Sequence, residues 1–196
     1  LSIDAKLFIK QLYIELKKLK KSPLKINTYS WHNYLNNLKN KYPLITNKIK
    51  KQKKYVNSYF FIDELSKKLS SNSVVVTDMG LSFVCTNQTI ITKSINQRHF
   101  SNAGHAPMGW GLPGAIGACF ANKKKQVICI AGDGGLQMNV QELATISHHK
   151  LPILIFLYNN KGYSTIIQTQ RLGFNSRIMG SNKKSGLSFP NFKSLS

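Results

Sequence analysis

The sequence predicts an α/β fold in which a parallel sheet is flanked by helices. Three short apolar segments have the length of strands and alternate with helical segments, in the order strand–helix–strand–helix–strand. With 196 residues and 42% hydrophobic composition, the chain is large enough to form a core. Ligands of parallel sheets bind beyond the carboxyl ends of the strands. The polar, glycine-containing turns of this chain follow the three predicted strands, at Asp78–Gly80, Gly132–Gly135 and Asn159–Gly162.

The part of the chain before the first strand is predicted to be helical, with charged connections. Residues 1–20 place apolar and polar residues at helical spacing. A second helix is expected after Pro23, because four apolar residues there are spaced as on one helical face: Trp31, Tyr34, Leu35 and Leu38. Residues 49–57 are predicted to be a charged linker. A third helix follows it, with Ser58 as a candidate N-cap and a core face formed by Phe61, Ile62 and Leu65.

The first strand is expected in "VVVTDMG", a β-branched run typical of a buried parallel strand. The later elements are expected in this order: a small-residue helix at 110–121, a strand at 127–131, a helix from about 135 to 148 and a strand at 153–158. Three strands make a narrow sheet, and the chain stops at "SFPNFKSLS", one turn into an expected new helix. We therefore expect an incomplete fragment of a longer protein.

The composition argues against several classes of function. The formal net charge of +21 comes almost entirely from lysine, and arginine, the better reader of bases, occurs only at 98, 171 and 177. We therefore expect no nucleic acid partner. No apolar run is long enough to span a membrane, so no membrane partner is expected either. The three cysteines lack metal-ligand spacing, and Cys119 and Cys129 are expected to be buried, reduced thiols, which fits a cytoplasmic location.

One of only seven acidic residues, Asp133, lies between two glycines where a strand ends and a helix begins. The free N–H groups of a helix N-terminus attract anions, and glycines at 132, 134 and 135 let a bulky group approach the backbone. The surroundings therefore suit a phosphate, yet Asp133 is itself an anion. A hard divalent cation, most simply Mg²⁺, resolves this conflict because it bridges carboxylates to phosphate oxygens.

The end of the next strand supplies further oxygen ligands for such a cation. The strand at 153–158 runs directly into two asparagines, and Gly162 offers a carbonyl in a tight turn. The Asp133 carboxylate, the Asn160 amide oxygen, the Gly162 carbonyl, two phosphate oxygens and a water would complete an octahedron. In the simpler alternative Asp133 caps the helix and the asparagines form an ordinary turn, and either motif alone would leave that alternative open.

Both motifs together match a known family signature. Gly-Asp-Gly, then 24 residues, then Asn-Asn resembles the thiamine-diphosphate motif of enzymes such as acetolactate synthase and pyruvate decarboxylase. The segments "GDGGLQMNVQELATI", "LPILIFLYNNKGY" and "MGWGLPGAIGA" are similar to the C-terminal cofactor-binding domain of the acetolactate synthase group, and "VVVTDMG" resembles its first strand. The resemblance implies a thiamine-diphosphate- and Mg-binding domain at 55–196, truncated at its C-terminus, a linker and helical segment at 23–54, and the tail of a central domain at 1–22.

The resemblance also implies the residues of the site. Asp133, Asn160 and the Gly162 carbonyl would hold Mg²⁺, and Gly134 and Gly135 would present backbone to the diphosphate. The family often has serine where Gly135 stands, so a backbone N–H is expected to replace one hydroxyl contact. The implied cofactor-binding set is Gly80, Ala106, Met108, Gly132, Asp133, Gly134, Gly135, Asn160 and Gly162.

Met108 is the one residue with an implied catalytic role. It matches the bulky residue that separates the pyrimidine from the thiazolium and bends the cofactor, so that the pyrimidine amino group reaches the carbon it must deprotonate. The backbone of Ala106 and Met108 would hold the pyrimidine edge. Without the resemblance, Met108 is interpreted as ordinary core filling. His105 is either a proton-transfer group or a polar loop residue.

A competing glycine motif is present in "GWGLPG". Gly109, Gly111 and Gly114 form G-x-G-x-x-G, and Asp133 follows the next strand, where a dinucleotide fold keeps its ribose-binding acid. This alternative would make the chain a dehydrogenase domain. It requires a strand immediately before the glycines, where "RHFSNAGHAP" is polar and broken, and it leaves the two asparagines unexplained.

The resemblance implies an enzyme that decarboxylates a 2-oxo acid, forms a carbon–carbon bond, or both. The family also needs a glutamate from a pyrimidine-binding domain of the same or a partner chain, usually in a homodimer or tetramer. Glu15, Glu64 and Glu142 are not expected to serve, so the chain alone should be inactive, and a non-catalytic remnant is the alternative. The segment "IIQTQ", which contains Thr169, departs from biosynthetic acetolactate synthases. Arg171 and Arg177 could meet a substrate carboxylate or be surface charges.

Overall fold

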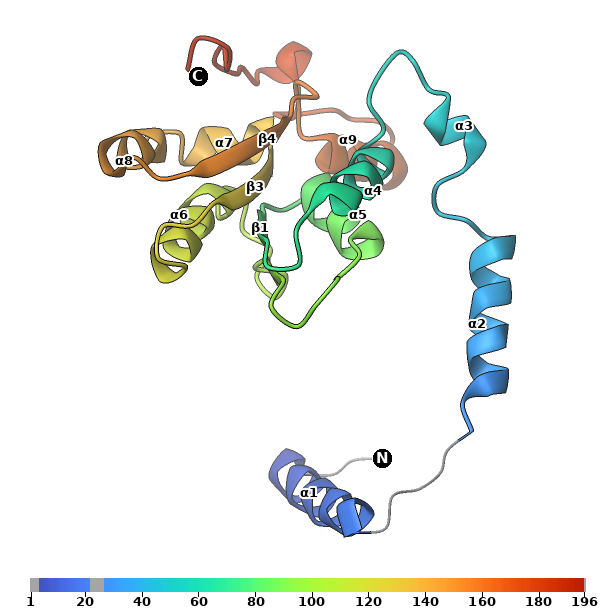
Figure 1. Cartoon of the computed structure of the whole chain (residues 1–196). Coiled ribbons are helices and arrows are strands. Elements are labelled where there is room, and N and C mark those ends of the chain that lie inside the picture. Colours follow the sequence, from blue (N-terminus) through green and yellow to red (C-terminus); the bar gives the residue numbers. More distant parts are fainter. Residues whose placement is uncertain (1–3, 22–26, 196) are drawn as a thin grey trace. The chain divides into compact units, whose positions relative to one another are not determined.

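The computed structural model describes residues 4–21 and 27–195 (Figure 1). The chain forms two compact units, Leu1–Pro43 and Leu44–Ser196. The predicted segments at 1–22 and 23–54 extend over residues 1–3 and 22–26, which lie outside the described part. The predicted domain boundaries therefore stay predictions.

The first unit contains two helices, α1 (Ala5–Lys21) and α2 (Tyr29–Lys41). Both helices were predicted. In α2 the rings of Trp31 and Tyr34 stack with centroids 5.6 Å apart, and Leu35 and Leu38 on the same face are half-buried. No residue of α2 is buried, and the described apolar side chains of α1 are exposed. In its described residues, 4–21 and 27–43, the first unit thus has helices with apolar faces but no buried core.

The second unit is built on a four-stranded parallel sheet with the strand order β2-β1-β3-β4 (Figure 1). The strands are β1 (Val74–Thr77), β2 (Arg98–Phe100), β3 (Val127–Gly132) and β4 (Ile153–Tyr158). All three neighbouring pairs are parallel, so their carboxyl ends meet at one edge of the sheet. The predicted parallel sheet is confirmed.

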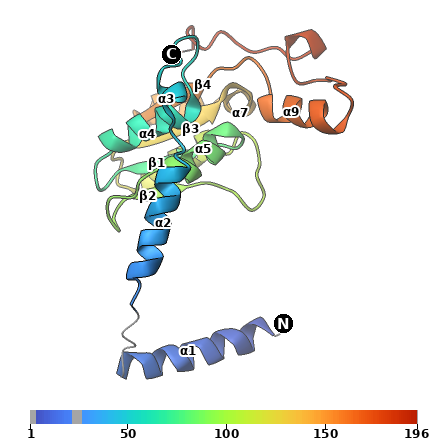
Figure 2. The same cartoon turned by 90° about the vertical axis from the view of Figure 1, so that its right-hand side faces the viewer.

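Helices cover both faces of this sheet (Figures 1 and 2). The helices of the second unit are α3 (Asn47–Lys50), α4 (Ser58–Lys68), α5 (Leu81–Thr89), α6 (Gly111–Ala121), α7 (Asp133–Met138), α8 (Glu142–His149) and α9 (Ser164–Gly173), with a 3-10 turn at Lys183–Ser185. On one face Val74 and Val76 pack with residues of α6, α7 and α8. On the other face Val75 packs with residues of α4 and α5. Alternate residues of β1 therefore serve opposite cores, as the two-residue period of a strand requires.

Several elements differ from the sequence prediction. Strand β2 and helices α5 and α9 were not predicted, and the expected helix at 135–148 is divided into α7 and α8 with a break at 139–141. The expected linker at 49–57 begins with the end of α3. The N-cap of α4 is Asn57, not Ser58: its side chain accepts hydrogen bonds from the backbone N–H groups of Tyr59 and Phe60. The core residue Ile62 was predicted correctly and is buried.

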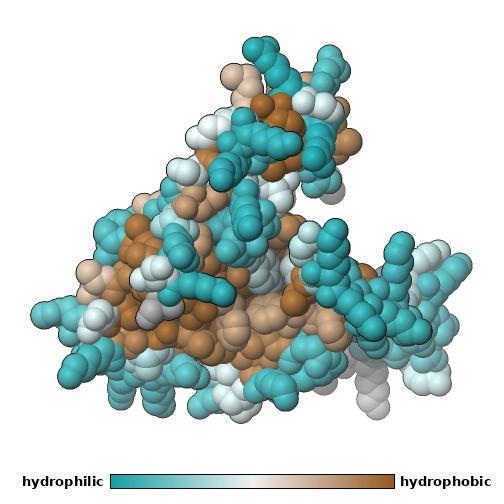
Figure 3. Space-filling model, turned by 90° about the horizontal axis from the view of Figure 1, so that it is seen from above, coloured by the Kyte–Doolittle hydropathy of each residue, from teal (hydrophilic) through white to brown (hydrophobic). Residues whose placement is uncertain are grey.

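The cysteine thiols are buried, whereas several large apolar side chains are exposed. Cys119 and Cys129 are buried free thiols, as expected, and so is Cys85. In the part of the chain that the structure describes, none of the helices has both the length and the apolar character needed to cross a bilayer. The face seen in Figure 3 carries apolar residues beside projecting hydrophilic ones. Large apolar side chains are also exposed near the C-terminal end, among them Leu172 and Phe174.

Candidate functional site

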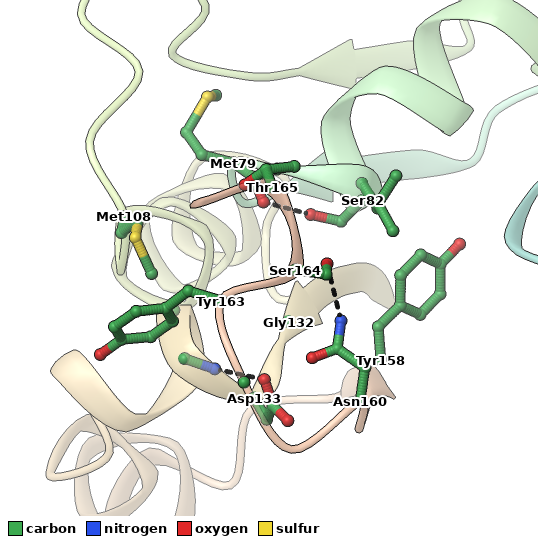
Figure 4. Close-up of a pocket in the computed structure, with 15 residues that line it drawn as sticks. Met79, Ser82, Met108, Gly132, Asp133, Tyr158, Asn160, Tyr163, Ser164 and Thr165 are labelled. Atoms are coloured by element: carbon green, nitrogen blue, oxygen red, sulfur yellow. Dashed lines mark hydrogen bonds between the residues drawn. The ribbon is translucent and has the colours of Figure 1, made fainter. Parts of the chain in front are cut away.

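A pocket of about 70 Å³ lies at the carboxyl ends of β1, β3 and β4 (Figure 4). Eight of the nine residues implied to bind the cofactor line it: Gly80, Met108, Gly132, Asp133, Gly134, Gly135, Asn160 and Gly162. Residues that the sequence analysis did not identify complete the lining: Met79, Leu81, Ser82, Tyr158, Tyr163, Ser164 and Thr165. The parallel sheet brings the three strand ends together, which explains how residues 80 positions apart share one cavity.

Asp133 is the first residue of α7 and directly follows β3, so its carboxylate is held at the edge of the sheet. Its side chain is only 1% exposed. Oδ1 accepts a hydrogen bond from the N–H of Gly134 at 2.8 Å, and Oδ2 accepts one from the N–H of Lys161. Burial raises the pKa of this carboxyl above its ordinary value, and the N–H groups of Lys161 and Gly134 oppose that rise. Among residues 4–21 and 27–195, Asp133 forms no ion pair, so a cation would compensate a buried charge here.

Asn160 lies two residues beyond the end of β4, the strand that pairs with β3. Its amide nitrogen donates to the hydroxyl of Ser164 at 3.1 Å, and no donor among residues 4–21 and 27–195 bonds to its amide oxygen, which can therefore accept from or coordinate a ligand. Figure 4 shows this oxygen turned towards the part of the pocket where Asp133 lies. The turn after Asn160 is fixed by a bridge between Gly162 and Asn182, and by the N–H of Tyr163, which donates to Ser181.

The glycines after Asp133 make room for side chains of the protein itself. A Cβ atom at Gly134 would lie 2.2 Å from the ring of Tyr163, and one at Gly135 would lie 1.7 Å from Oδ2 of Asp78. From the sequence, Gly134 and Gly135 were interpreted only as residues that let the ligand approach the backbone. The structure adds a second reason for glycine at both positions, because no side chain fits there while Tyr163 and Asp78 keep their places.

Asp78 is a second buried carboxylate at this edge, and the sequence analysis gave it no role. It follows β1, is 1% exposed, and accepts from the N–H of Gly109 with both oxygens, at 3.0 and 3.1 Å. Burial raises its pKa, and the N–H groups of Met79, Gly109 and Gly111 oppose that rise. The signal that identified Asp133, a rare acid directly after an apolar strand, could have identified Asp78 as well.

Other candidate residues are not brought to the pocket. Ala106 and His105 are exposed in the loop before Met108, and neither lines the cavity. Arg171 in α9 and Arg177 after it are exposed and also lie outside the lining. No glutamate lines the pocket in the described residues: Glu142 accepts from the hydroxyl of Thr145, and the other glutamates pair with lysines of their own helices.

A parallel sheet with a buried aspartate and an asparagine beyond two adjacent strands defines a domain that suits a cation and a phosphate-bearing cofactor. Residues 78–196 match the family described as thiamine pyrophosphate enzyme, C-terminal TPP binding domain. The chain belongs to this family, and thiamine diphosphate (thiamine pyrophosphate, TPP) is the cofactor that the family description names.

The curated relatives belong to the acetolactate synthase group. The chain is 33% identical over 183 residues to the acetolactate synthase large subunit of Cyanidium caldarium, covering 93% of this chain and 30% of that protein. It is 33% identical over 183 residues to the probable acetolactate synthase large subunit of Methanococcus aeolicus, covering 89% and 30%. It is 31% identical over 159 residues to the acetolactate synthase isozyme 1 large subunit of Escherichia coli (strain K12), covering 81% and 28%. The chain thus spans about 30% of the length of these curated relatives.

Family membership confirms the resemblance seen in the sequence and removes the support for a dinucleotide-binding dehydrogenase. The structure agrees, because β2 ends at Phe100 and residues 101–110 separate it from α6, so no strand runs directly into the glycine motif. Gly109 and Gly111 instead pack against protein groups. A Cβ at Gly109 would lie 2.9 Å from Cβ of Met138, and one at Gly111 would lie 2.7 Å from Cβ of Asp78.

Proposed function

We propose that this chain is the thiamine-diphosphate- and Mg²⁺-binding part of an acetolactate synthase-like enzyme. The enzyme would decarboxylate a 2-oxo acid, form a carbon–carbon bond, or both. The observation that carries the proposal is the joint position of Asp133 and Asn160 beyond neighbouring strands, in one pocket with Gly162. Acetolactate synthase large subunits are the relatives with the matching sequence.

The donor set fits a hard divalent cation. The Asp133 carboxylate, the Asn160 amide oxygen and the Gly162 carbonyl are all oxygen donors, which Mg²⁺ prefers. No group of three His, Cys, Asp or Glu side chains able to hold a metal occurs in the described residues, which argues against a softer transition-metal site there. Asp133 is buried without an ion pair in that part of the chain, so a bound cation would offset the cost of burying its charge.

The residues of the chain would bind and orient the cofactor. When bound, thiamine diphosphate supplies the electron-accepting ring that decarboxylation of a 2-oxo acid requires. Asp133, Asn160 and Gly162 would hold the cation between the protein and the diphosphate. Met108 lines the pocket and would separate the two rings of the cofactor, as the catalytic role implied for it requires. Gly80 and Gly132 would border the diphosphate, and Ala106 would contribute backbone after a movement of its exposed loop.

The pocket is only part of a complete site. Its volume of about 70 Å³ is well below the roughly 300–1,000 Å³ of pockets that enclose a whole small-molecule ligand. No glutamate of the described residues lines it. We therefore propose that a pyrimidine-binding domain, from the same or a partner chain, supplies the glutamate and the second wall. A homodimer or tetramer would bring these parts together, with residues 55–196 as the cofactor domain.

The metal bridge is tested by measuring thiamine diphosphate binding with and without Mg²⁺. The comparison is between the wild-type protein at its natural length, Asp133→Ala, and the control Asp63→Ala, which removes a carboxylate paired with Lys67 on α4. We expect Mg²⁺-dependent binding in the wild type and the control, and its loss in Asp133→Ala. Equal binding by Asp133→Ala and the wild type would contradict the proposal.

The catalytic part of the proposal is tested separately, with pyruvate as the first 2-oxo acid. The protein at its natural length should turn over a 2-oxo acid, and the 196-residue chain alone should not. Cofactor binding without turnover of any 2-oxo acid would favour the alternative, a remnant that keeps the binding fold and has lost catalysis.

A further inference from the structure

Both backbone polar groups of Gly109 are held by side chains from two other parts of the fold. The N–H donates to the two carboxylate oxygens of Asp78, at 3.0 and 3.1 Å. The carbonyl oxygen accepts from the amide nitrogen of Asn139 at 2.8 Å. Gly109 is buried and has φ +89°, a conformation that glycine adopts without strain. The peptide groups that flank Gly109 are therefore fixed on both sides.

The two side chains are themselves held in place. Asp78 is packed so closely that a Cβ at Gly111 or at Gly135 would collide with it, at 2.7 and 1.7 Å. Asn139 is the C-cap residue of α7, and its amide oxygen accepts from the side chain of Gln141 at 3.1 Å. Asp78 is buried with little free space around it, and Asn139 is held by the hydrogen bond from Gln141, so the arrangement is preorganised.

The hydrogen bonds that Asp78 and Asn139 form with Gly109 lie where the loop before α6 joins the core. The five residues that precede Met108, at 103–107, are exposed, whereas Gly109 directly after it is buried. Met108 itself lines the pocket, and its terminal methyl carbon lies 3.2 Å from the position of a Cβ at Gly134. The position of the Met108 backbone is therefore set from its C-terminal side, by Asp78 and Asn139.

We propose that Asp78 and Asn139 are positioning residues that fix the distance between Met108 and the Asp133 end of the pocket. Asn139 ends the helix that Asp133 begins, so α7 carries the proposed metal ligand at one end and the restraint on the Met108 loop at the other. A cofactor would then have its diphosphate and its ring system set by one short helix. This inference rests on the proposed function, because it assigns Met108 the orientation of the cofactor rings.

The test uses two substitutions of Asn139 in the protein at its natural length. Asn139→Ala removes the donor to Gly109, and Asn139→Asp keeps the shape while placing an acceptor against the Gly109 carbonyl. The control is Asn122→Ala, because Asn122 is likewise the C-cap asparagine of a helix, α6, and does not line the pocket. If the hydrogen bond matters, Asn139→Asp should be at least as damaging as Asn139→Ala. If only packing matters, Asn139→Asp should be nearly harmless.

Three measurements distinguish a positioning role of Asn139 from a general loss of structure in the variants. In the protein without cofactor, amide hydrogen exchange of a peptide covering 103–110 should accelerate by roughly two- to tenfold, the range expected for one lost hydrogen bond. The dissociation constant for thiamine diphosphate with Mg²⁺ should change by less than about threefold, because the proposed metal ligands are untouched. The exchange of the thiazolium C2 hydrogen of bound cofactor with deuterated solvent should slow by about tenfold or more, since ring orientation governs it.

The outcomes for this inference and for the proposed function are distinct. A wild-type protein that binds no thiamine diphosphate would contradict the proposed function. A wild type that binds it, with C2 exchange unchanged in both Asn139 variants, would overturn the inference alone. Equal losses of affinity and C2 exchange would also overturn it, because they indicate a general structural role. If Asn139→Ala and Asn139→Asp do not fold, Asn139→Gln decides between these results by the same three measurements, because it keeps an amide donor on a longer side chain.

Discussion

Gly135 and Asp78 share a space that is too small for one more atom, which makes residue 135 a sensitive position. A Cβ at Gly135 would lie 1.7 Å from Oδ2 of Asp78 and 2.8 Å from its Cγ. Gly135→Ala therefore requires a shift of a buried carboxylate or of α7, and we expect it to reduce the free energy of unfolding by about 1–3 kcal/mol. Urea denaturation of the two proteins measures this difference.

The control for this substitution is another helical glycine with open space around it. A Cβ at Gly117 in α6 would meet nothing within 4 Å. Gly117→Ala should raise the free energy of unfolding by up to about 1 kcal/mol, because alanine favours the helix and restricts the unfolded chain. If Gly135→Ala were as stable as Gly117→Ala, the close approach of Asp78 to residue 135 would be refuted.

The pKa of Asp133 predicts how pH affects the site. Burial raises this pKa in the folded protein above its ordinary value of 3.8. Because the group is an acid with a raised pKa, its contribution to stability without metal is present below the unfolded pKa and is lost as pH rises through the folded pKa. Mg²⁺ binds the ionised carboxylate, so metal-dependent stabilisation should have the opposite trend and weaken as pH falls.

The measurement compares melting temperatures with and without Mg²⁺ and thiamine diphosphate, from about pH 8 down to about pH 5. The increase in melting temperature should diminish at a higher pH than an ordinary carboxyl would allow. Asp78 also has a raised pKa, so the comparison with Asp133→Asn isolates Asp133. An Asp133→Asn protein that kept the wild-type increase and its pH dependence would rule out Asp133 as the titrating ligand.

At the scale of elements, the start of α4 distinguishes the structure from the sequence prediction. The side chain of Asn57 accepts from the N–H groups of Tyr59 and Phe60, at 3.0 and 3.3 Å, whereas Ser58 lies inside the helix. Asn57→Ala should lower the free energy of unfolding by about 1 kcal/mol, the usual cost of removing an N-cap. Ser58→Ala should cost less. Chemical denaturation of both variants tests this order, and the reverse order would restore Ser58 as the cap.

The elements that were predicted well are those whose own residues carry a clear pattern. Strands β3 and β4 were predicted to within one residue, because each is a continuous apolar run in the sequence, although only β3 is buried on both faces. Strand β2 has only three residues, and it is a strand because residues 98–100 pair with β1. Nothing in its own pattern indicates this. The break between α7 and α8 was missed for a similar reason, since Asn139 turns its side chain to Gly109, a residue distant in sequence.

The candidate site shows the same difference between residues that a local motif predicts and contacts that depend on the folded structure. Asp133, Asn160 and Gly162 could be identified because two motifs at fixed spacing share one chemical requirement. Asp78 carries the same signal as Asp133, a rare acid directly after an apolar strand, but its contacts and those of Tyr163 could not be predicted, because they depend on which residues face Gly134 and Gly135 in space. Ala106 was assigned from the family pattern alone, and the structure keeps it exposed and outside the pocket lining. Contacts between separate elements are therefore what the sequence reasoning lacked.

At the scale of the whole molecule, stability is expected to reside in the second unit. Among the described residues, the buried apolar ones lie between Ile62 and Leu151, whereas α2 has no buried residue and the described apolar side chains of α1 are exposed. Since burial of apolar area supplies most of the stability of a fold, α1 and α2 should add little to it. A chain that begins at Leu44 should therefore unfold in urea at nearly the same midpoint and with nearly the same slope as the full 196 residues.

A longer deletion provides the matched comparison for this last prediction. A chain that begins after Lys68 also lacks α4, whose Ile62 is 1% exposed and belongs to the core that covers one face of the sheet. Losing Ile62 alone removes a buried side chain of a kind that costs about 2–5 kcal/mol when truncated, so this protein should be strongly destabilised or unfolded. If the chain beginning at Leu44 lost a comparable amount, the first unit would have to contribute to the fold through burial, contrary to the exposure of its helices. If it kept the wild-type midpoint, the cofactor site could be studied in the second unit alone, because every residue proposed to bind cofactor or metal lies within Leu44–Ser196.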